Sequence, residues 1–456
     1  MQSQWDFATK QLSEKAREQF KEEIRGFIRE IQRFNNGITV LEKYPDLALR
    51  AFKLMNQTFK NSAKGYKSWR LFQIVFIVSM IPDIVSREIE EIKPMAQHEK
   101  VDLIYFPTGG GKTETYLGTV IFTMFFDRIR GKNAGTTALI KFPLRLLSLQ
   151  QLQRAVDITA QAELIRRKQH DLIDTDPFTV GYFVGNNNTP NKLYDSERRE
   201  DLIPTITAMS EQERRDKFLV IDRCPYCQCD SISIEVLLDE RRLVHVCKNQ
   251  NCDENILPLY IIDREIYRYL PTFIVSTLDK SALIGLQRNF RNIFGNFNKK
   301  CPLHGFTSQE KCLESEGDMC NVPIENFENV YVYDPSPSLI IQDELHLVRE
   351  SLGAFNAHYE TFINYFLSEF SLLKRPIKFI AATATISDYE QQVYHLYHKE
   401  AIRFPSPSPY IDKSFYAYTD YEDLNRVIIG VAPYGKTPVY SILDMIQYYR
   451  EEINRL

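Results

Sequence analysis

Three consecutive glycines stand directly before a lysine and a threonine in the segment FPTGGGKTETYL, which runs from Phe106 to Leu117. Glycines let backbone N–H groups approach an anion closely, because no Cβ stands in the way. We expect Lys112 to bridge the β- and γ-phosphates of a nucleotide and the Thr113 hydroxyl to ligate Mg²⁺. The residues expected to contact the nucleotide in this loop are Thr108, Gly109, Gly110, Gly111, Lys112 and Thr113. Because Phe106 replaces the first glycine of the general G-x-x-x-x-G-K-[ST] pattern, a plain glycine turn is the alternative.

A pair of acids far downstream offers the second half of such a site. The segment SLIIQDELHL is an apolar run that ends in Asp343 and Glu344. We expect Asp343 to hold Mg²⁺ and Glu344 to activate the attacking water, whereas the alternative is an acid pair that caps the next helix. The segment IKFIAATATIS ends in Thr383 and Thr385, whose hydroxyls can hydrogen-bond to the acid pair and relay the state of the nucleotide.

All eight cysteines of the chain lie between Cys224 and Cys320. In a cytosolic chain such clustering favours metal binding over disulfides. A first set, with the spacing of a four-thiolate zinc ribbon, consists of Cys224, Cys227, Cys247 and Cys252. Cys229 is a spare thiol that could replace Cys227. A second, looser set consists of Cys301, His304, Cys312 and Cys320, for which reduced surface thiols are the alternative. Each set supplies four ligands without an open position, so both predict structural rather than catalytic zinc.

Short apolar segments that alternate with helical ones must position these residues. The segments with the pattern of buried strands are VDLIYF, GTTALIKF, FTVGYFV, PTFIVSTL, SLIIQDE and IKFIAATAT. Segments of helical periodicity lie between several of them, which predicts an α/β fold with a parallel sheet covered by helices on both faces. The glycine loop then joins a strand to a helix, which is the context that a phosphate-binding loop requires.

The same pattern predicts how the chain divides into regions. Residues 1–100 have helical periodicity and predict an N-terminal helical region. Residues 101–410 carry the strand–helix alternation, which two polar, cysteine-bearing insertions interrupt at 186–263 and 289–330. Residues 411–456 follow as a C-terminal segment.

Composition limits the possible partners. The chain has 456 residues, 44% of them apolar and 25% charged, with a formal net charge of −4. A nucleic-acid surface would therefore be a local groove and not a global positive field. The N-terminus has no apolar signal core, and the longest apolar stretch, LFQIVFIVSMIPDIV, is too short to span a bilayer and contains Pro82. We expect a soluble, cytoplasmic protein without a membrane partner.

The ordered segments PTGGGKT, DELH and TAT resemble motifs I, II and III of the superfamily-two helicases and translocases. Longer stretches, among them FPLRLLSLQQLQRA and QDELHLVRESLGAFNAHYE, resemble the helicase-like component A of the DISARM anti-phage defence system. The resemblance runs from about Trp69 to Tyr410 and implies a RecA-like motor lobe that uses ATP and Mg²⁺. It adds His346, the last residue of DELH, to the catalytic set, and it implies that Gln73 of the segment RLFQ contacts adenine.

The resemblance also implies contacts with DNA, single- or double-stranded. FPLRLLSLQQLQRA occupies the position of motif Ia and STLDK that of motif Ib. The residues implied to contact the nucleic-acid backbone are Arg145, Gln150, Arg154, Thr277 and Lys280. The alternative is a leucine-rich helix that packs in the core, with its arginines solvated.

Family members continue into a second RecA-like domain that supplies an arginine finger, and NRVIIGVAPYGKTPVY does not match that motif. The chain alone is therefore expected to bind ATP but to hydrolyse it poorly. Expected partners are other defence-system subunits or a chain that carries the second lobe. A nucleotide-switched binding or scaffold subunit is the competing function, and a metabolic P-loop kinase is disfavoured by the order of the motifs.

Overall fold

The computed structural model describes residues 14–62, 66–107, 109–185, 190–195, 198, 200–282, 287–308, 311–370, 375–384, 388–408, 413–418 and 437–455, together with 420, 430, 433 and 435. The chain divides into two compact units, 2–407 and 408–456. The second unit contains helix α13 (Pro438–Arg455). All of the elements below belong to the first unit.

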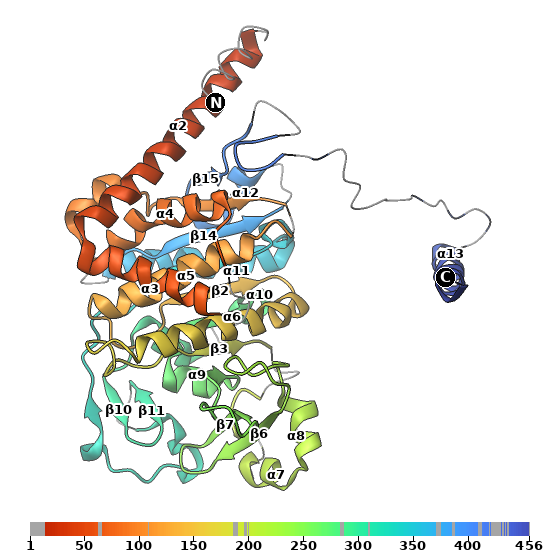
Figure 1. The fold of residues 1–456 in the computed structure, drawn as a ribbon. Coiled ribbons are helices and arrows are strands. Elements are labelled where there is room, and N and C mark those ends of the chain that lie inside the picture. The colour runs from red at the N-terminus through yellow and green to blue at the C-terminus, as the bar shows by residue number, and fades with distance from the viewer. Residues whose placement is uncertain are drawn as a thin grey trace. The chain divides into compact units, whose positions relative to one another are not determined.

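Within the described residues, eight strands form one sheet in the order β15-β1-β14-β13-β2-β9-β3-β8 (Figure 1). Every neighbouring pair in this sheet is parallel. The strands are β1 (Val101–Tyr105), β2 (Ala138–Phe142), β3 (Val180–Phe183), β8 (Leu259–Tyr260), β9 (Phe273–Thr277), β13 (Leu339–Gln342), β14 (Lys378–Thr383) and β15 (Ala401–Phe404). The predicted parallel sheet is confirmed, and its six predicted strands are β1, β2, β3, β9, β13 and β14.

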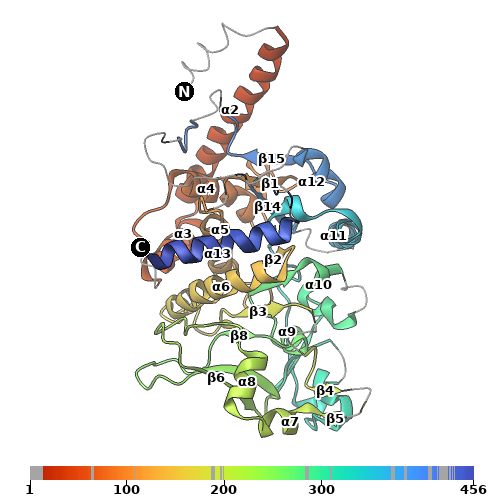
Figure 2. The ribbon, with the colours of Figure 1, turned by 90° about the vertical axis from the view of Figure 1, so that its right-hand side faces the viewer.

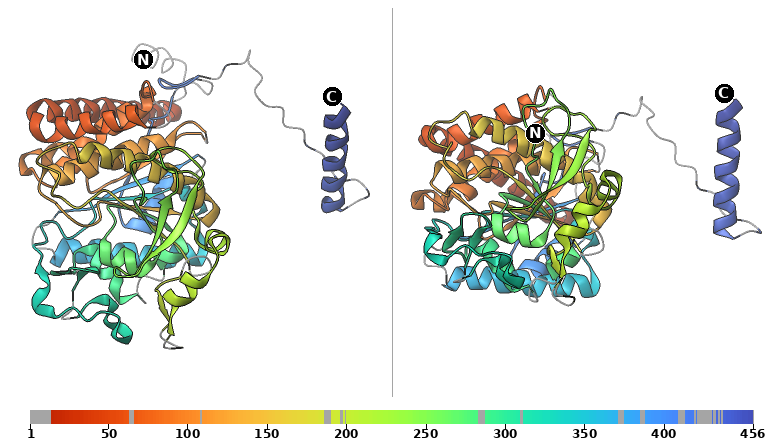
Figure 3. Two further views of the ribbon diagram at one scale, coloured as in Figure 1. Left: turned by 60° about the horizontal axis from the view of Figure 1, so that its bottom comes forward. Right: turned by 90° about the horizontal axis from the view of Figure 1, so that it is seen from below.

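Helices cover both faces of the sheet (Figure 3). On one face lie α3 (Arg50–Asn61), α4 (Leu71–Val85), α5 (Lys112–Ile129) and α6 (Arg145–Arg166). On the other lie α9 (Asp263–Tyr269), α10 (Leu278–Ala282), α11 (Glu350–Phe370) and α12 (Tyr389–Tyr397). Because helices cover both faces, most residues of the central strands are apolar and buried. Five neighbouring strands contribute Leu103, Leu139, Ile274, Ile340 and Phe379 to one buried cluster.

The predicted N-terminal helical region is present. Helix α2 (Glu14–Lys43) packs along α4, which is buried over nearly its whole length. Arg33 of α2 donates hydrogen bonds to Asp83 of α4 and to Asp102 of β1, each with one N–O distance of 3.0 Å. Lys378 of β14 lies 2.7 Å from Asp83 and 2.6 Å from Asp102. These four buried charges join the helical region to the sheet. No described helix is both long enough and apolar enough to cross a membrane.

Both cysteine-bearing insertions lie at the β8 end of the sheet, opposite α2 (Figure 2). The elements of the first are β4 (Tyr194–Asp195), β5 (Glu200–Asp201), α7 (Leu202–Ala208), α8 (Glu211–Phe218), β6 (Ile232–Leu237) and β7 (Arg242–Cys247). Those of the second are β10 (Lys299–Cys301), β11 (Gly305–Thr307) and β12 (Glu328–Asn329). Arg241, between β6 and β7, lies 2.9 Å from Asp201 and 3.2 Å from Glu314 of the second insertion. The two insertions therefore pack against each other.

Candidate functional site

The glycine loop connects the end of β1 to the start of α5. Gly109 and Gly111 have φ angles of +78° and +100°, in the left-handed region that favours glycine. A Cβ at Gly110 would lie 2.4 Å from the ring of Phe106. All three glycines are thus required by the backbone, whereas Thr108 lies outside the described residues. Because α5 begins at Lys112, the loop ends at a helix N-terminus, where N–H groups are free to bind an anion.

Two side chains from the start of α4 hold this loop. The Gln73 amide donates to the carbonyl oxygen of Gly111 at 3.0 Å, and its own oxygen accepts from the backbone N–H of Arg70 at 2.8 Å. The Arg70 guanidinium donates to the carbonyl of Gly110 at 2.5 Å. Gln73 thus lies directly against the glycine loop, and its contact with adenine stays a prediction.

Lys112 spans the loop from the helix side. Its ammonium donates to the carbonyl oxygen of Phe106 at 2.8 Å, and the side chain is largely buried. A phosphate group in the loop would accept hydrogen bonds from the same ammonium. Lys112 therefore reaches across the glycine loop, and its contact with the phosphates of a nucleotide stays a prediction.

The acid pair follows β13 at the same edge of the sheet. One Asp343 carboxylate oxygen accepts from the N–H of Glu344 at 2.8 Å, and the other accepts from the Tyr116 hydroxyl at 3.0 Å. Burial and the neighbouring charge of Glu344 raise the pKa of Asp343 to about 6, against the lowering effects of these two hydrogen bonds and of the Lys112 charge. Glu344 has a φ of 47°, a strained backbone for a residue other than glycine.

The loop and the acid pair meet because β14 is the only strand between β1 and β13 in the described sheet. Parallel strands bring their carboxyl ends to one edge, where ligands bind in open α/β sheets. The oxygen of the Tyr116 hydroxyl lies 3.4 Å from Thr113 Oγ1 and 3.0 Å from Asp343 Oδ2, so one hydroxyl reaches both predicted Mg²⁺ ligands. Hydroxyl and carboxylate oxygens are the ligands that Mg²⁺ prefers, so the residues present fit this ion.

The third motif contacts the second through a histidine. His346 Nδ1 lies 3.0 Å from the Thr383 hydroxyl and 3.4 Å from Glu344 Oε2. Thr383 thus contacts the histidine beside Glu344, and its predicted hydrogen bond to the acids themselves stays a prediction. Thr385 lies outside the described residues. His346 thus links the end of β14 to the acid that follows β13.

The first turns of α6 carry two of the five residues implied to contact nucleic acid. Gln150 is exposed and Arg145 is half-buried. The neighbouring Leu146 and Leu149 are exposed, Leu146 by 75%. This helix therefore begins as a surface element at the carboxyl end of β2, and packs in the core only further along.

Arg154, one turn further along α6, has another partner. Its guanidinium forms an ion pair with Glu114 of the glycine-loop segment and donates to Gln151 Oε1 at 3.0 Å. Glu114 also accepts from the Tyr66 hydroxyl at 3.1 Å. Arg154 thus connects α6 to the phosphate-binding loop.

The two residues of motif Ib are buried. Thr277 ends β9 and is 1% exposed. Lys280 is 3% exposed, forms an ion pair with Asp263 and donates to Asn191 Oδ1 at 3.0 Å. A contact between Lys280 and a phosphate would require this buried pair to break, so the structure gives Lys280 a structural contact in place of an exposed one.

The first cysteine set converges on one point. The ligand atoms of Cys224, Cys227, Cys247 and Cys252 all lie within 4.8 Å of one another. The Sγ–Sγ distances are 3.9 Å for Cys224–Cys252 and 3.7 Å for Cys227–Cys247. Tetrahedral zinc with thiolates at about 2.3 Å separates its sulfurs by about 3.8 Å, so the set fits a zinc ion. Cys229 Sγ lies beside it, 3.3 Å from Cys227 and 3.5 Å from Cys247.

The second set converges as well. The ligand atoms of Cys301, His304, Cys312 and Cys320 lie within 4.8 Å of one another. Cys301 Sγ is 3.8 Å from His304 Nδ1 and 3.9 Å from Cys320 Sγ. Three of the four residues are buried. These are not scattered surface thiols, and the three thiolates and one imidazole can hold a zinc ion.

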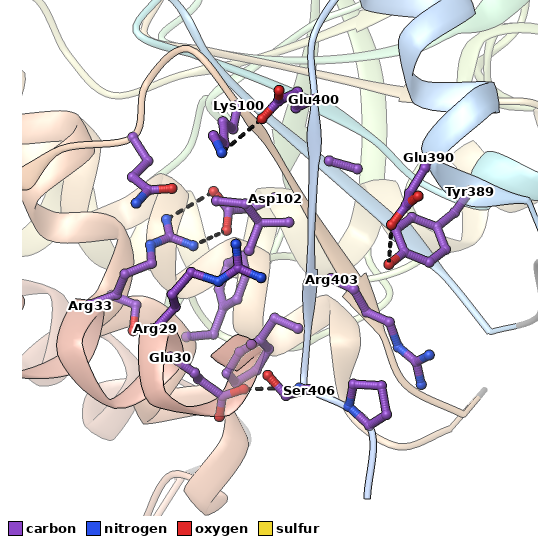
Figure 4. A pocket seen from close by; sticks show the side chains of 18 of the residues that line it. Arg29, Glu30, Arg33, Lys100, Asp102, Tyr389, Glu390, Glu400, Arg403 and Ser406 are labelled. Atoms are coloured by element: carbon purple, nitrogen blue, oxygen red, sulfur yellow. Dashed lines mark hydrogen bonds and ion pairs between the residues drawn. The ribbon is translucent and has the colours of Figure 1, made fainter. Parts of the chain in front are cut away.

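A cavity of about 720 Å³ lies elsewhere, between α2, α12 and the edge strand β15 (Figure 4). None of the predicted site residues line it. Its charged groups are largely paired with one another: Lys100 lies 2.8 Å from Glu400, and Glu30 accepts from the N–H of Ser406 at 2.9 Å. Because these groups already satisfy each other, the cavity does not compete with the loop as the functional site.

Three residues of the site were not predicted from the sequence: Arg70, Glu114 and Tyr116. A signal existed for Tyr116, because it follows Lys112 by four residues on a helix and Thr113 by three, so all three share one face. Arg70 and Glu114 act through partners distant in sequence, which no local pattern reveals.

The DISARM protein DrmA of Bacillus paralicheniformis (strain ATCC 9945a / NCIMB 11709 / CD-2) is 31% identical to this chain over 426 residues, which cover 85% of this chain and 37% of that protein. The chain is thus a relative of DrmA and spans little more than a third of its length, and the resemblance inferred from the sequence is confirmed. No family model matches the chain.

Solved structures were also compared. The crystal structure of the DUF1998 helicase MrfA is 11% identical with a TM-score of 0.37, over 78% of this chain and 33% of that one. The same helicase bound to DNA and AMPPNP is 10% identical with a TM-score of 0.37, over 77% and 28%.

Proposed function

We propose that the chain is the ATP-binding lobe of a DNA-dependent ATPase of the helicase and translocase class that acts in anti-phage defence. The observation that carries this proposal is that Thr113, next to Lys112 at the start of α5, and Asp343, after β13, contact the same Tyr116 hydroxyl at the carboxyl edge of the sheet. Kinship with the DISARM protein DrmA supports the defence role.

Each residue has a distinct part in the proposed reaction. The N–H groups of the glycine loop and the Lys112 ammonium bind the phosphates, and Gln73 contacts the adenine beside them. Thr113 and Asp343 would hold Mg²⁺, which neutralises charge on the phosphates when bound. Glu344 accepts a proton from the attacking water. His346 contacts both Glu344 and Thr383, and so couples this acid to the end of β14.

Nucleic acid is proposed to contact the start of α6. Arg145 and Gln150 can donate to phosphate oxygens without reading sequence. Arg154 would couple the binding of nucleic acid at these residues to the glycine loop, because Arg154 and Glu114 form an ion pair. The paired cysteine sets would each hold a structural zinc ion that stabilises an insertion.

A nucleotide-switched scaffold subunit is the second candidate. The observation that favours it is that Arg154 and Lys280, two of the five residues implied to contact nucleic acid, form ion pairs within the protein. In that case ATP would bind at the same loop, and its turnover would be indifferent to DNA.

Nucleotide binding and turnover test the proposal. We expect Lys112→Ala to weaken the binding of a fluorescent ATP analogue by about 10- to 100-fold, because a charge-assisted hydrogen bond to phosphate is worth about 1.5–3 kcal/mol. Lys60→Ala, on the exposed end of α3, is the matched control. Wild-type ATP turnover that rises with added DNA supports the motor. Turnover unaffected by DNA would favour the scaffold, and equal binding by both variants would contradict the nucleotide site.

A further inference from the structure

A tyrosine that no motif singles out occupies the centre of the proposed magnesium site. Tyr116 belongs to the second turn of α5 and is 1% exposed. Its hydroxyl contacts both Thr113 and Asp343. A buried tyrosine needs a hydrogen-bond partner for its hydroxyl, but the core offers many carbonyl groups for that purpose. Here the partner is the acid at the centre of the site.

The direction of these hydrogen bonds follows from the groups involved. The Asp343 carboxylate can only accept, so the Tyr116 O–H donates to it at 3.0 Å. The same hydroxyl lies 3.4 Å from Thr113 Oγ1, which is its second and longer contact.

The other contacts of Asp343 show what the tyrosine contributes. The N–H of Glu344 fixes one carboxylate oxygen, and this donor belongs to the backbone of the same segment. Tyr116 fixes the second oxygen, Oδ2, from a different element. The carboxylate is therefore held at both oxygens, and the tyrosine ties its orientation to the helix that carries Lys112 and Thr113.

Building on the proposed function, we propose that Tyr116 is a positioning residue for the metal. Its hydroxyl orients the Asp343 carboxylate relative to Thr113. A carboxylate oxygen of Asp343 and the hydroxyl oxygen of Thr113 can then bind the same divalent cation, which is bound with the nucleotide. Groups that hydrogen-bond to metal ligands orient them, and their loss typically costs about 10- to 100-fold in metal affinity.

The test separates metal-dependent from metal-independent nucleotide binding. The dissociation constant of a fluorescent ATP analogue is measured with EDTA and again with saturating Mg²⁺, and the ratio of the two constants reports the contribution of the metal. We expect Tyr116→Phe, which keeps the ring, to reduce this ratio by about 10- to 100-fold and to leave binding in EDTA unchanged.

Two further variants sharpen the result. Tyr182→Phe is the matched control, because Tyr182 is also 1% exposed and its hydroxyl lies 3.2 Å from Ser148 Oγ, away from the loop; we expect its ratio to equal that of the wild type. Because Tyr116 is proposed to act through Asp343, Tyr116→Phe should have no further effect on the ratio in an Asp343→Asn background.

The outcomes are distinguishable. An unchanged ratio in Tyr116→Phe overturns the inference while leaving the nucleotide site intact. Equal losses with and without Mg²⁺ overturn it too, because they indicate that the hydroxyl supports the fold of the loop and not the metal. Wild-type protein that binds no nucleotide in either condition would remove the proposed function, and the inference with it.

Discussion

At the residue scale, Asp343 and Glu344 are neighbours in the chain with different surroundings. Asp343 is 7% exposed and both of its oxygens accept hydrogen bonds. Glu344 is more exposed and has a left-handed backbone, which turns its side chain toward His346. The held carboxylate suits a metal ligand, and the freer one suits a group that accepts a proton from water.

This difference predicts the behaviour of Glu344→Gln. We expect ATP turnover to fall by at least about 100-fold, because general bases contribute about 10²- to 10⁴-fold to such reactions. Binding of the nucleotide should persist, since glutamine keeps the shape of the side chain and Asp343 is untouched. Single-turnover hydrolysis and analogue binding, measured on the same preparation, check both parts.

Glu90→Gln is a suitable control, because Glu90 is 84% exposed and forms an ion pair with nearby Lys93, outside the glycine loop. Turnover in Glu344→Gln equal to that of this control would assign the proton transfer to another group. Loss of nucleotide binding together with turnover would instead place Glu344 among the binding residues.

The sequence could predict residues whose role follows from a local pattern. Lys112 and Asp343 stand at strand ends in motifs of fixed spacing, and the structure brings them to one edge. The burial of a side chain, and its contacts with residues that are distant in the sequence, produce no such local pattern. Lys280 and Arg154 are both implied by the resemblance to contact nucleic acid, yet Lys280 is paired with Asp263 in the core and Arg154 is paired with Glu114.

At the scale of elements, too, local patterns could be predicted from the sequence and contacts between distant segments could not. Six strands were predicted because each is an apolar run next to a helical segment. The edge strands β8 and β15 were missed: β8 has two residues, and β15 carries Arg403 before the proline-rich segment that reads as a linker. Cysteine spacing predicted both metal sets, but not that Arg241 would join their insertions.

The zinc-binding insertions offer a prediction at this scale. The hairpin β6–β7 is short and would lose its main cross-link if the first cysteine set lost its metal. We expect Cys252→Ser to remove one zinc per chain and to expose residues 200–260 to limited proteolysis, with nucleotide binding unchanged. Zinc content and mass-mapped cleavage sites provide the measurement.

Cys229→Ser is the matched control, because this thiol lies beside the set but outside the four that converge. It should keep its zinc and its resistance to protease. If Cys229→Ser loses the ion while Cys227→Ser keeps it, then Cys229 is the ligand and the assignment of the set is wrong.

At the scale of the first unit, the site depends on elements that are far apart in the sequence. The glycine loop is held by α4, and α4 is held by α2 and by the four charges of Arg33, Asp83, Asp102 and Lys378. Asp102 lies in β1, the strand that leads into the loop. A change at these charges should therefore affect the whole unit and not the chemistry of the site alone.

Arg33→Met tests this connection. Removing one partner from a buried ion pair costs about 3–5 kcal/mol, because it leaves an unpaired buried charge. Lys378 remains beside both acids, so we expect a loss near the lower end, about 3 kcal/mol, and a fall of several degrees in the unfolding temperature. Arg25→Met removes an exposed arginine from the same helix, whose pair with Glu22 is exposed on both sides, and such pairs contribute at most about 1 kcal/mol. Thermal unfolding of the two variants side by side gives the comparison, and equal unfolding temperatures would show that the buried charges do not hold the helical region to the sheet.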